Sequence, residues 1–263
     1  LRVSDERKAF YPVGQSGREL NRRTMLKILV IIPTYNEKDN LSELVKRLPS
    51  IDGLELLFID DHSPDRTADW IRNLAQSRPG IHLLERPSKL GLGTAYLAGF
   101  KWALERDFDL VFEMDADLSH DPAEIPNFIR KIEDGADLVI GSRYMKGGRV
   151  INWPKERIVL SRFGGAWTRI WTGLPLTDPT GGYKCFHRKV LAAIRLDGIR
   201  SNGYAFQIEM DYYAWKKGFR LAEVPIAFTE RQEGSSKMSR HIIFEAVWRV
   251  PWLRLASLFR LRA

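Results

Sequence analysis

Two carboxylates one residue apart, Asp115 and Asp117, stand in the segment MDADLSH at 114–120, at the end of an apolar run. In an extended segment, alternate side chains project to the same side, so these two negative charges repel each other unless a cation lies between them. Oxygen ligands of this kind favour Mg²⁺ or Mn²⁺ over Zn²⁺. The pair therefore indicates a candidate divalent-metal site, although an Asp-x-Asp segment is more often simple turn chemistry, and that alternative stays open here.

The composition limits the kinds of protein that this chain can be. At 263 residues with 44% hydrophobic residues, it is long enough for one large α/β domain or two small ones. The single cysteine, Cys185, excludes an intrachain disulfide, and none of the five histidines are paired at metal-binding helical spacing. A structural zinc site is therefore not expected, and a reducing, cytoplasmic setting fits best.

The net charge of +8, from 41 basic and 33 acidic side chains, favours anionic partners such as nucleic acid, nucleotide phosphates or an anionic membrane. Zinc-finger, RNP-like and basic-region motifs are absent, so we expect no nucleic-acid partner. Residues 1–25 are polar and rich in Arg, which predicts a disordered basic tail. No signal peptide is visible, and no apolar run approaches the roughly 18 residues that a membrane span needs.

Short apolar runs alternate with helix-like stretches through the first half of the chain, a pattern typical of βαβ units. It predicts a single α/β domain with a Rossmann-like, mostly parallel central sheet flanked by helices. The expected strands are 26–32, 54–59, 80–84, 108–114 and 136–140, and the expected helices are 39–48, 65–75, 92–105 and one that begins at 121. In the second half, the expected helices are 155–173 and 204–217, and the expected strands are 183–187 and 219–228.

Ligands of such sheets bind beyond the carboxyl ends of the strands. Polar residues follow three of the expected strands, at 33–37, at Asp60 and Asp61, and at Asp115 and Asp117. Each cluster alone could be a loop or a helix cap. Together on one edge of the sheet, they favour a nucleotide site built from carboxylates and a metal.

Other nucleotide-binding motifs are excluded. The segment LGLGTA at 90–95 lacks the third glycine of a dinucleotide fingerprint, because Tyr96 stands there, and it does not follow the first strand. The chain contains no Gly-Lys dipeptide, so a P-loop is impossible, and the HExxH and GxSxG motifs are absent. These absences disfavour dehydrogenases, P-loop enzymes, zinc proteases and serine hydrolases.

Six motifs stand in order along the chain: PTYNE at 33–37, DDHSPD at 60–65, LGLGTAY at 90–96, MDADLSH at 114–120, GSRY at 141–144 and GSSK at 234–237. This set resembles the family 2 glycosyltransferases of the GT-A fold. Among them it is most similar to the dolichol-phosphate mannosyltransferases, also called polyprenol monophosphomannose synthases. The resemblance implies a GT-A catalytic domain over 26–240, preceded by the basic tail and followed by an amphipathic segment at 241–263.

The resemblance also implies roles for particular residues in holding GDP-mannose. The nucleoside would contact Pro33, Tyr35, Glu37, Ile59 and Asp61. A tyrosine offers a stacking face, and carboxylates accept hydrogen bonds from base or ribose donors, so these residue types suit the task.

The diphosphate would lie against Asp115, Ala116 and Asp117. Asp117 would be the ligand of Mg²⁺ or Mn²⁺, and Asp115 would support the metal and the sugar. Ser119 stands where some relatives carry Gln, so it is a weaker second ligand. Three basic residues, Arg143, Arg231 and Lys237, would complete the catalytic set by binding the donor and acceptor phosphates.

The reaction that the resemblance implies is the metal-dependent, inverting transfer of mannose from GDP-mannose to a polyprenyl phosphate. A phosphate monoester has a second pKa near ~6, so the acceptor is mostly dianionic at neutral pH and needs no histidine base. We therefore expect no protein nucleophile. The main difficulty of the reaction is the charge on the GDP leaving group.

A polyprenyl acceptor resides in the bilayer, so we expect a peripheral enzyme on the cytoplasmic face of a membrane, and an integral membrane partner is a further expectation. The segment 241–263 mixes Trp, Ile, Leu and Phe with Arg, which is typical of an interfacial helix. Trp153, Trp167 and Trp171 would extend its surface. The alternative, a terminal helix packed on the core, stays open.

Two other functions remain as alternatives. The donor could be UDP-glucose, because the base and sugar are the features that the sequence specifies least. From a different class, the chain could be a catalytically silent subunit that binds a lipid surface. The presence of Asp115, Asp117, Arg143 and Lys237 argues against the silent subunit.

Overall fold

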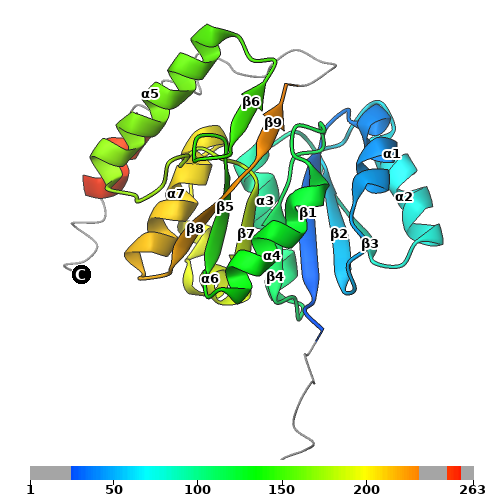
Figure 1. The fold of residues 1–263 in the computed structure, drawn as a ribbon. Coiled ribbons are helices and arrows are strands. Elements are labelled where there is room, and N and C mark those ends of the chain that lie inside the picture. The colour runs from blue at the N-terminus through cyan, green and yellow to red at the C-terminus, as the bar shows by residue number, and fades with distance from the viewer. Residues whose placement is uncertain (1–24, 231–247, 256–263) are drawn as a thin grey trace, which may run out of the picture.

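The computed structural model describes residues 25–230 and 248–255. Within these ranges, a seven-stranded sheet forms the centre of the fold, in the order β3-β2-β1-β4-β7-β5-β8 (Figure 1). Its strands are β1 (Ile28–Thr34), β2 (Leu54–Asp60), β3 (Ile81–Glu85), β4 (Leu110–Glu113), β5 (Leu138–Ser142), β7 (Lys184–His187) and β8 (Leu221–Pro225). Neighbouring strands are parallel except at β7, which runs antiparallel to both β4 and β5.

Helices cover both faces of this sheet (Figure 1). They are α1 (Lys38–Arg47), α2 (Thr67–Ser77), α3 (Leu92–Leu104), α4 (Ile125–Glu133), α5 (Lys155–Thr172), α6 (Arg188–Ala193) and α7 (Gly203–Lys216), with short 3₁₀ turns η1 (Pro122–Glu124) and η2 (Leu196–Gly198). A separate two-stranded parallel ribbon joins β6 (Arg149–Ile151) and β9 (Ala227–Thr229). Residues 248–255 are helical.

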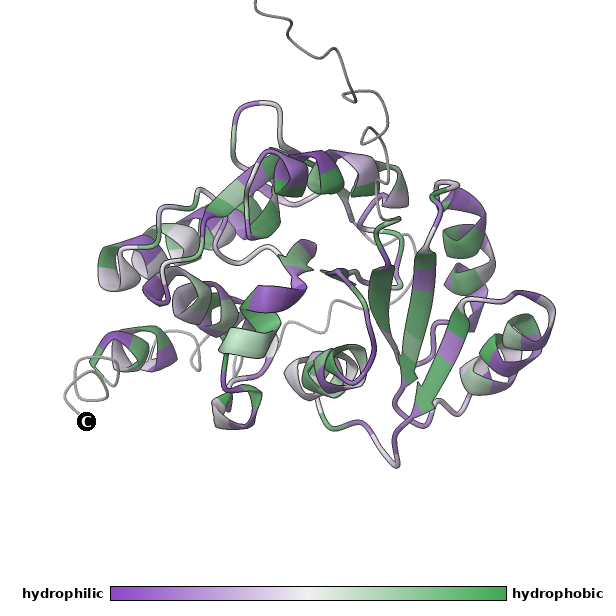
Figure 2. Cartoon of the chain, turned by 90° about the horizontal axis from the view of Figure 1, so that it is seen from below, coloured by the Kyte–Doolittle hydropathy of each residue, from purple (hydrophilic) through white to green (hydrophobic). Residues whose placement is uncertain are grey.

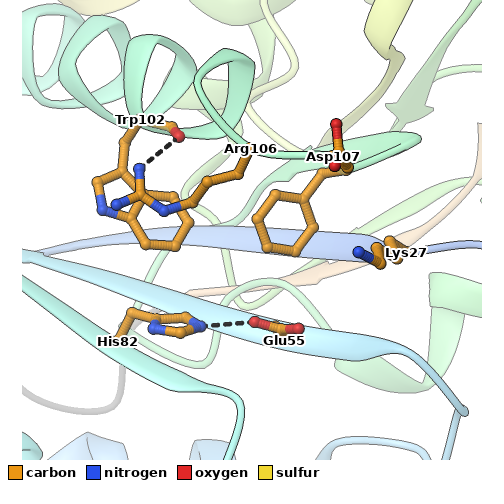
Figure 3. A pocket seen from close by; sticks show the side chains of 7 residues that line it. Lys27, Glu55, His82, Trp102, Arg106 and Asp107 are labelled. Carbon is orange, nitrogen blue, oxygen red and sulfur yellow. Dashed lines mark hydrogen bonds and ion pairs between the residues drawn. The ribbon is translucent and has the colours of Figure 1, made fainter.

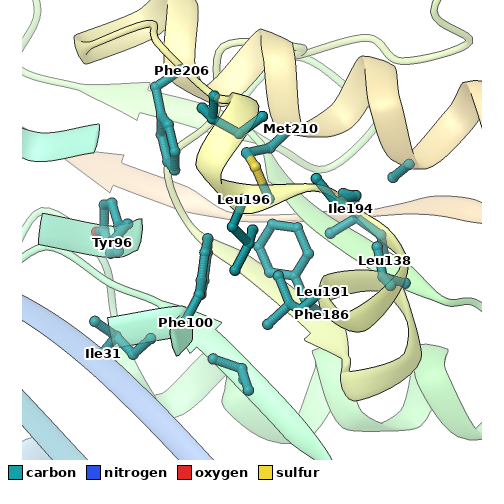
Figure 4. Close-up of a cluster of buried hydrophobic side chains, with 14 of the residues drawn as sticks. Ile31, Tyr96, Phe100, Leu138, Phe186, Leu191, Ile194, Leu196, Phe206 and Met210 are labelled. Atoms are coloured by element: carbon teal, nitrogen blue, oxygen red, sulfur yellow. The ribbon is translucent and has the colours of Figure 1, made fainter. Parts of the chain in front are cut away.

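Strand alternation divides the core into two clusters. Leu29 and Ile31 of β1 point to one face, where they pack with side chains of α3, α6 and α7; aromatic residues such as Phe100 and Phe206 fill this cluster (Figure 4). Val30 and Ile32 point to the other face and pack with side chains of α1, α2 and α4. In Figure 2, the helices carry both hydrophobic and hydrophilic residues, as expected for elements with one face on the sheet.

The expected fold class, a mostly parallel sheet flanked by helices in a single domain, is confirmed. The strand expected at 219–228 is wrong in its extent, because it is divided between β8 of the main sheet and β9 of the ribbon. The Ile226 N–H still donates to the Ser142 carbonyl of β5 at 3.1 Å, while the Ile226 carbonyl accepts from the N–H of Arg149 at 3.0 Å, so the chain passes from the main sheet to the ribbon at this residue. The sequence patterns missed β6 and α6.

None of the helices in the two described ranges combines the length and the apolarity that crossing a bilayer requires.

Candidate active site

The loops after β1 and β2 are joined by polar contacts. Thr34 ends β1 opposite Asp60 of β2, and its hydroxyl donates to the Asp60 carboxylate at 3.0 Å. The Ser63 hydroxyl donates to the same carboxylate at 2.6 Å and accepts from the peptide N–H of Asn36 at 3.0 Å. The PTYNE and DDHSPD segments therefore form one hydrogen-bonded unit at the carboxyl edge of the sheet.

Asp61, a predicted nucleoside contact, forms a buried bidentate pair with Arg86. The Arg86 Nε and Nη2 atoms donate to the two carboxylate oxygens at 2.5 and 2.7 Å, and Nη1 donates to the Thr94 hydroxyl at 2.8 Å. Thr94 lies in the first turn of α3, so this pair links the second and third strand ends to the LGLGTAY motif. The orientation of the Asp61 carboxylate is consequently fixed.

The other predicted nucleoside residues lie around this unit. The Lys89 ammonium stands 4.2 Å from the centre of the Tyr35 ring, and the Glu37 carboxylate accepts from the Asn40 amide at 2.8 Å. Pro33 is half-buried near the end of β1. The Ile59 side chain is fully buried in the core cluster beneath α3, and its carbonyl accepts from the Thr34 hydroxyl at 3.4 Å.

The Asp117 turn is a compact structure stabilised by Ser119. The Ser119 hydroxyl and peptide N–H donate to the same Asp117 oxygen at 2.6 and 3.1 Å. Leu118 between them has φ +62°, a left-handed conformation that is uncommon for a residue with a side chain. Ala116 and Asp117 are both buried, and Asp115 is half-buried. The turn thus presents its carboxylates in a fixed arrangement.

Two further groups surround Asp115. The Tyr96 hydroxyl donates to its carboxylate at 3.4 Å, and His120 Nδ1 accepts from its peptide N–H at 3.1 Å. Burial, with Asp115 and Glu113 as additional causes, raises the pKa of Tyr96 well above 10. Tyr96 is therefore a neutral donor at physiological pH.

The donor set at this turn fits a hard divalent cation. Asp115 and Asp117 supply carboxylate oxygens, and Mg²⁺ in proteins commonly takes one or two carboxylates together with substrate phosphates and water. Among the described residues, no group of three or more His, Cys, Asp or Glu side chains is arranged as a metal site. The expected ligand set, one carboxylate with Ser119 beside it, is smaller than such a group.

Arg143, predicted to bind phosphate, follows β5 and forms a buried bidentate pair with Asp178. Its Nε and Nη2 atoms donate to the carboxylate oxygens at 2.6 and 2.7 Å, and Nη2 also donates to Thr180 at 2.9 Å. Burial opposes the charge of both partners, but their mutual hydrogen bonds raise the pKa of Arg143 and lower that of Asp178. Both groups are therefore charged at neutral pH.

Phe228 of β9 connects the two halves of the site. Its ring lies 5.4 Å from that of His120 and 5.5 Å from the Arg143 guanidinium carbon. The structure therefore brings the ends of β4 and β5 to one place. Arg231, Lys237 and the GSSK motif lie outside the described residues, so their predicted roles stay predictions.

The sequence patterns gave no role to five members of the site, which are Arg86, Tyr96, His120, Asp178 and Phe228. Arg86 directly follows β3, so the strand-end rule that selected Asp61 would have found it if applied to the third strand. Asp178 lies in a loop 35 residues from its partner Arg143, and nothing in the local sequence signals that pairing.

A concavity of about 440 Å³ lies elsewhere, between the amino ends of the strands (Figure 3). His82 and Glu55 pair across its floor at 2.6 Å, and Arg106 stacks on Trp102 at its rim. It is at the opposite edge of the sheet from Asp117, so it is separate from the candidate active site.

Comparisons with known proteins show which family the sequence matches. The sequence model of the family described as Glycosyl transferase family 2 matches residues 29–195. The chain is 46% identical, over 88% of its length and 96% of the relative's, to the undecaprenyl-phosphate mannosyltransferase of Micrococcus luteus. It is also 46% identical, over 87% of both chains, to the polyprenol monophosphomannose synthase of Mycolicibacterium smegmatis.

Solved structures support the fold. A mannosyltransferase from Pyrobaculum calidifontis in complex with GDP-Man and Mn²⁺ superposes with a TM-score of 0.57 at 19% identity, covering 90% of this chain and 74% of that one. With the family match, this likeness confirms the expected GT-A-like architecture and the expected enzyme class, a glycosyltransferase. The chain belongs to glycosyl transferase family 2.

Proposed function

We propose that this chain transfers mannose from GDP-mannose to a polyprenyl phosphate, with inversion at the anomeric carbon. The observation that carries the proposal is the Asp117 turn at the carboxyl edge of β4, beside the β1–β2 unit, in a chain 46% identical to two enzymes named for polyprenyl-phosphate mannose transfer. The mannosyltransferase of similar fold that was solved with GDP-Man and Mn²⁺ supports the choice of donor and metal.

Each part of the site has a task in this proposal. The β1–β2 unit, with Asp61 fixed by Arg86, would orient the nucleoside. Asp117 would hold Mg²⁺ or Mn²⁺, with Ser119 beside it, and the metal would supply positive charge for the diphosphate leaving group. Asp115 would support the sugar and diphosphate, and Tyr96 would keep that carboxylate in place.

Positive charge in the remaining part of the site would come from Arg143, Arg231 and Lys237. Asp178 binds Nε and Nη2 of Arg143, so a phosphate would have to approach the guanidinium from another side. No general base is required, because the acceptor phosphate is itself the nucleophile.

A direct assay tests the donor. The full chain, given a polyprenyl phosphate and Mn²⁺ or Mg²⁺, should transfer radiolabelled mannose from GDP-mannose in preference to glucose from UDP-glucose. EDTA should abolish the transfer, and excess Mn²⁺ should restore it. A preference for UDP-glucose would refute the donor assignment, and full activity in EDTA would refute the metal.

A membrane-facing surface is the second part of the proposal. Large apolar side chains on α5 are exposed, including Phe163 at 63% and Ile170 at 73%, and Trp248 and Trp252 project from helix 248–255. The two helices meet where Arg254 donates to the Trp171 carbonyl at 3.0 Å. We call this surface, Val159, Leu160, Phe163, Ile170, Trp171, Trp248, Trp252 and Leu255, the apolar face.

The apolar face fits a bilayer with anionic headgroups, because Arg162, Arg169 and Arg254 lie exposed along the same helices. Within 248–255, Val250 and Leu253 are buried, so this segment packs one side on the core and exposes the other. Of the three tryptophans expected to extend the surface, Trp171 is exposed, whereas Trp167 is partly buried against the core and Trp153 packs against Phe228. A peripheral position on the cytoplasmic face, next to an integral partner, completes the proposal.

The double substitution Phe163→Glu with Ile170→Glu should lower binding to vesicles of phosphatidylglycerol and phosphatidylcholine by about a hundredfold, since each apolar side chain contributes about 1.5–3 kcal/mol on burial. Both positions are exposed, so the melting temperature should stay close to that of the wild-type chain. Vesicle flotation measures the partition, and Met25→Ser, at an exposed position off the apolar face, is the control. Unchanged flotation of the double variant would refute this surface.

A further inference from the structure

The β6–β9 ribbon stands apart from the main sheet and has three residues in each strand. A two-stranded ribbon is marginally stable at best on its own. Its position must therefore be set by contacts with its neighbours, and those contacts lie on two sides.

On one side, the ribbon contacts the Asp117 turn. The peptide N–H of Thr229 donates to the carbonyl of Ser119 at 3.4 Å. Phe228 packs edge-on against His120, and His120 in turn accepts the hydrogen bond from the Asp115 peptide. A shift of β9 would thus act on both carboxylate-bearing positions of the turn.

On the other side, the ribbon is tied to α5. Arg157 in the first turn of α5 donates to the Glu230 carboxylate at 2.6 Å, directly after β9. The same guanidinium lies 4.0 Å from the centre of the Trp153 ring, and Trp153 packs edge-on against Phe228. The Glu230 peptide N–H donates to Ile151 of β6 at 3.1 Å.

We propose that Arg157 and Glu230 form an ion pair that positions the Asp117 turn. The pair fixes the ribbon to α5, and the ribbon holds Ser119 and His120 in place through Thr229 and Phe228. Neither residue contacts the carboxylates of the turn, so both act through the ribbon. The inference rests on the proposed function, because it assigns the pair a role in the geometry of that same site.

The expected sizes of two effects, one on the stability of the fold and one on the site, distinguish a positioning role from a general stabilising role. The side chains of Arg157 and Glu230 are 22% and 32% exposed, and ion pairs this accessible to water stabilise a fold by only about 0–1 kcal/mol. Catalytic sites are more sensitive, since a displacement of about 1 Å can cost about a hundredfold in rate. Loss of the pair should therefore affect the site much more than the melting temperature.

The test uses the full chain with Glu230→Gln, Arg157→Gln and the charge swap R157E with E230R. In each single variant, we expect the Thr229 amide to exchange its hydrogen about tenfold faster in metal-free buffer. We expect the Mn²⁺ concentration for half-maximal GDP binding to rise about tenfold as the turn loosens. The charge swap should recover most of both losses, because it restores the pair with reversed polarity.

The matched control is Asp197→Asn. It removes another long-range ion pair, Lys101 with Asp197 at 2.5 Å, which joins α3 to η2 far from the ribbon. This variant should leave both readouts unchanged. The positioning role would be overturned if Glu230→Gln gave wild-type values for amide exchange and for the Mn²⁺ dependence of GDP binding. It would also be overturned if the charge swap restored neither quantity relative to the single variants. If the wild-type chain itself binds no GDP with Mn²⁺, the proposed function fails first, which is a distinguishable result.

Discussion

Replacing Asp117 with Asn is expected to lower the rate of mannose transfer by about 100- to 1,000-fold, the size of effect seen when one group that stabilises developing charge is removed. Asn keeps the shape and one acceptor oxygen, so Ser119 can still donate to residue 117 and the turn should persist. What the variant loses is the negative charge that would hold the cation at the leaving diphosphate. The rate at saturating donor and the Mn²⁺ dependence of the rate are the measurements.

A control four residues further along the chain separates this effect from a damaged loop. Asp121 is exposed, and its side chain caps η1 by accepting from the Ala123 N–H at 3.0 Å. Asn caps a helix about as well as Asp, so Asp121→Asn should keep the wild-type rate and stability. If Asp117→Asn transferred mannose as fast as Asp121→Asn, the metal role of the turn would be untenable.

The parts of the site that the sequence could predict are those that depend on local pattern. β1 and β2 are seven-residue apolar strands, long enough for the alternation with helices to be visible, and Asp61 and Asp117 follow from the rule that ligands bind at strand ends. The strands of the ribbon have three residues each, too few for any periodicity. The antiparallel direction of β7 is set by its insertion between β4 and β5, which the order of elements does not reveal.

For a related reason, the sequence could not predict the partners of the charged residues. Arg143 and Asp61 both stand at strand ends, and their types suggested direct contacts with the substrate. In the structure, Asp61 forms a bidentate pair with Arg86, 25 positions away, and Arg143 forms one with Asp178, 35 positions away. Pairing over such distances depends on tertiary geometry. Residue type and spacing alone therefore could not distinguish a residue that contacts the ligand from one that holds another side chain in position.

Glu113→Gln is expected to make the stability of the fold less dependent on pH. Glu113 ends β4 beneath the Asp117 turn, is fully buried, and faces Lys184 across the sheet. Within the described part of the chain, neither of its carboxyl oxygens has a hydrogen-bond partner; the Gln207 amide is near enough to affect its pKa but outside hydrogen-bond geometry. Burial raises the pKa of Glu113 from 4.5 to about 8, although Lys184 and Gln207 oppose the rise.

The neighbouring groups explain why Glu113 carries the proton. Lys184 donates to Asp211 at 2.5 Å and to the Gln207 carbonyl at 2.8 Å, so its charge is matched by Asp211. Burial also raises the pKa of Asp211, to about 6, and the Lys184 charge limits that rise. Between pH 6 and 8 the cluster therefore holds one ion pair and one neutral acid, Glu113.

The sign of the effect follows from the raised pKa. Between pH 4.5 and 8, the unfolded chain has released the Glu113 proton and the folded chain has kept it, so the stability of the fold falls as pH rises. From pH 6 to 8, Glu113→Gln should gain up to about 3 kcal/mol relative to wild type, since one proton contributes about 1.4 kcal/mol per pH unit. Chemical denaturation in metal-free buffer at both pH values measures the difference. Glu133→Gln, at an exposed site on α4, should follow wild type, and a Glu113→Gln curve parallel to both would show that Glu113 is ionised in the fold.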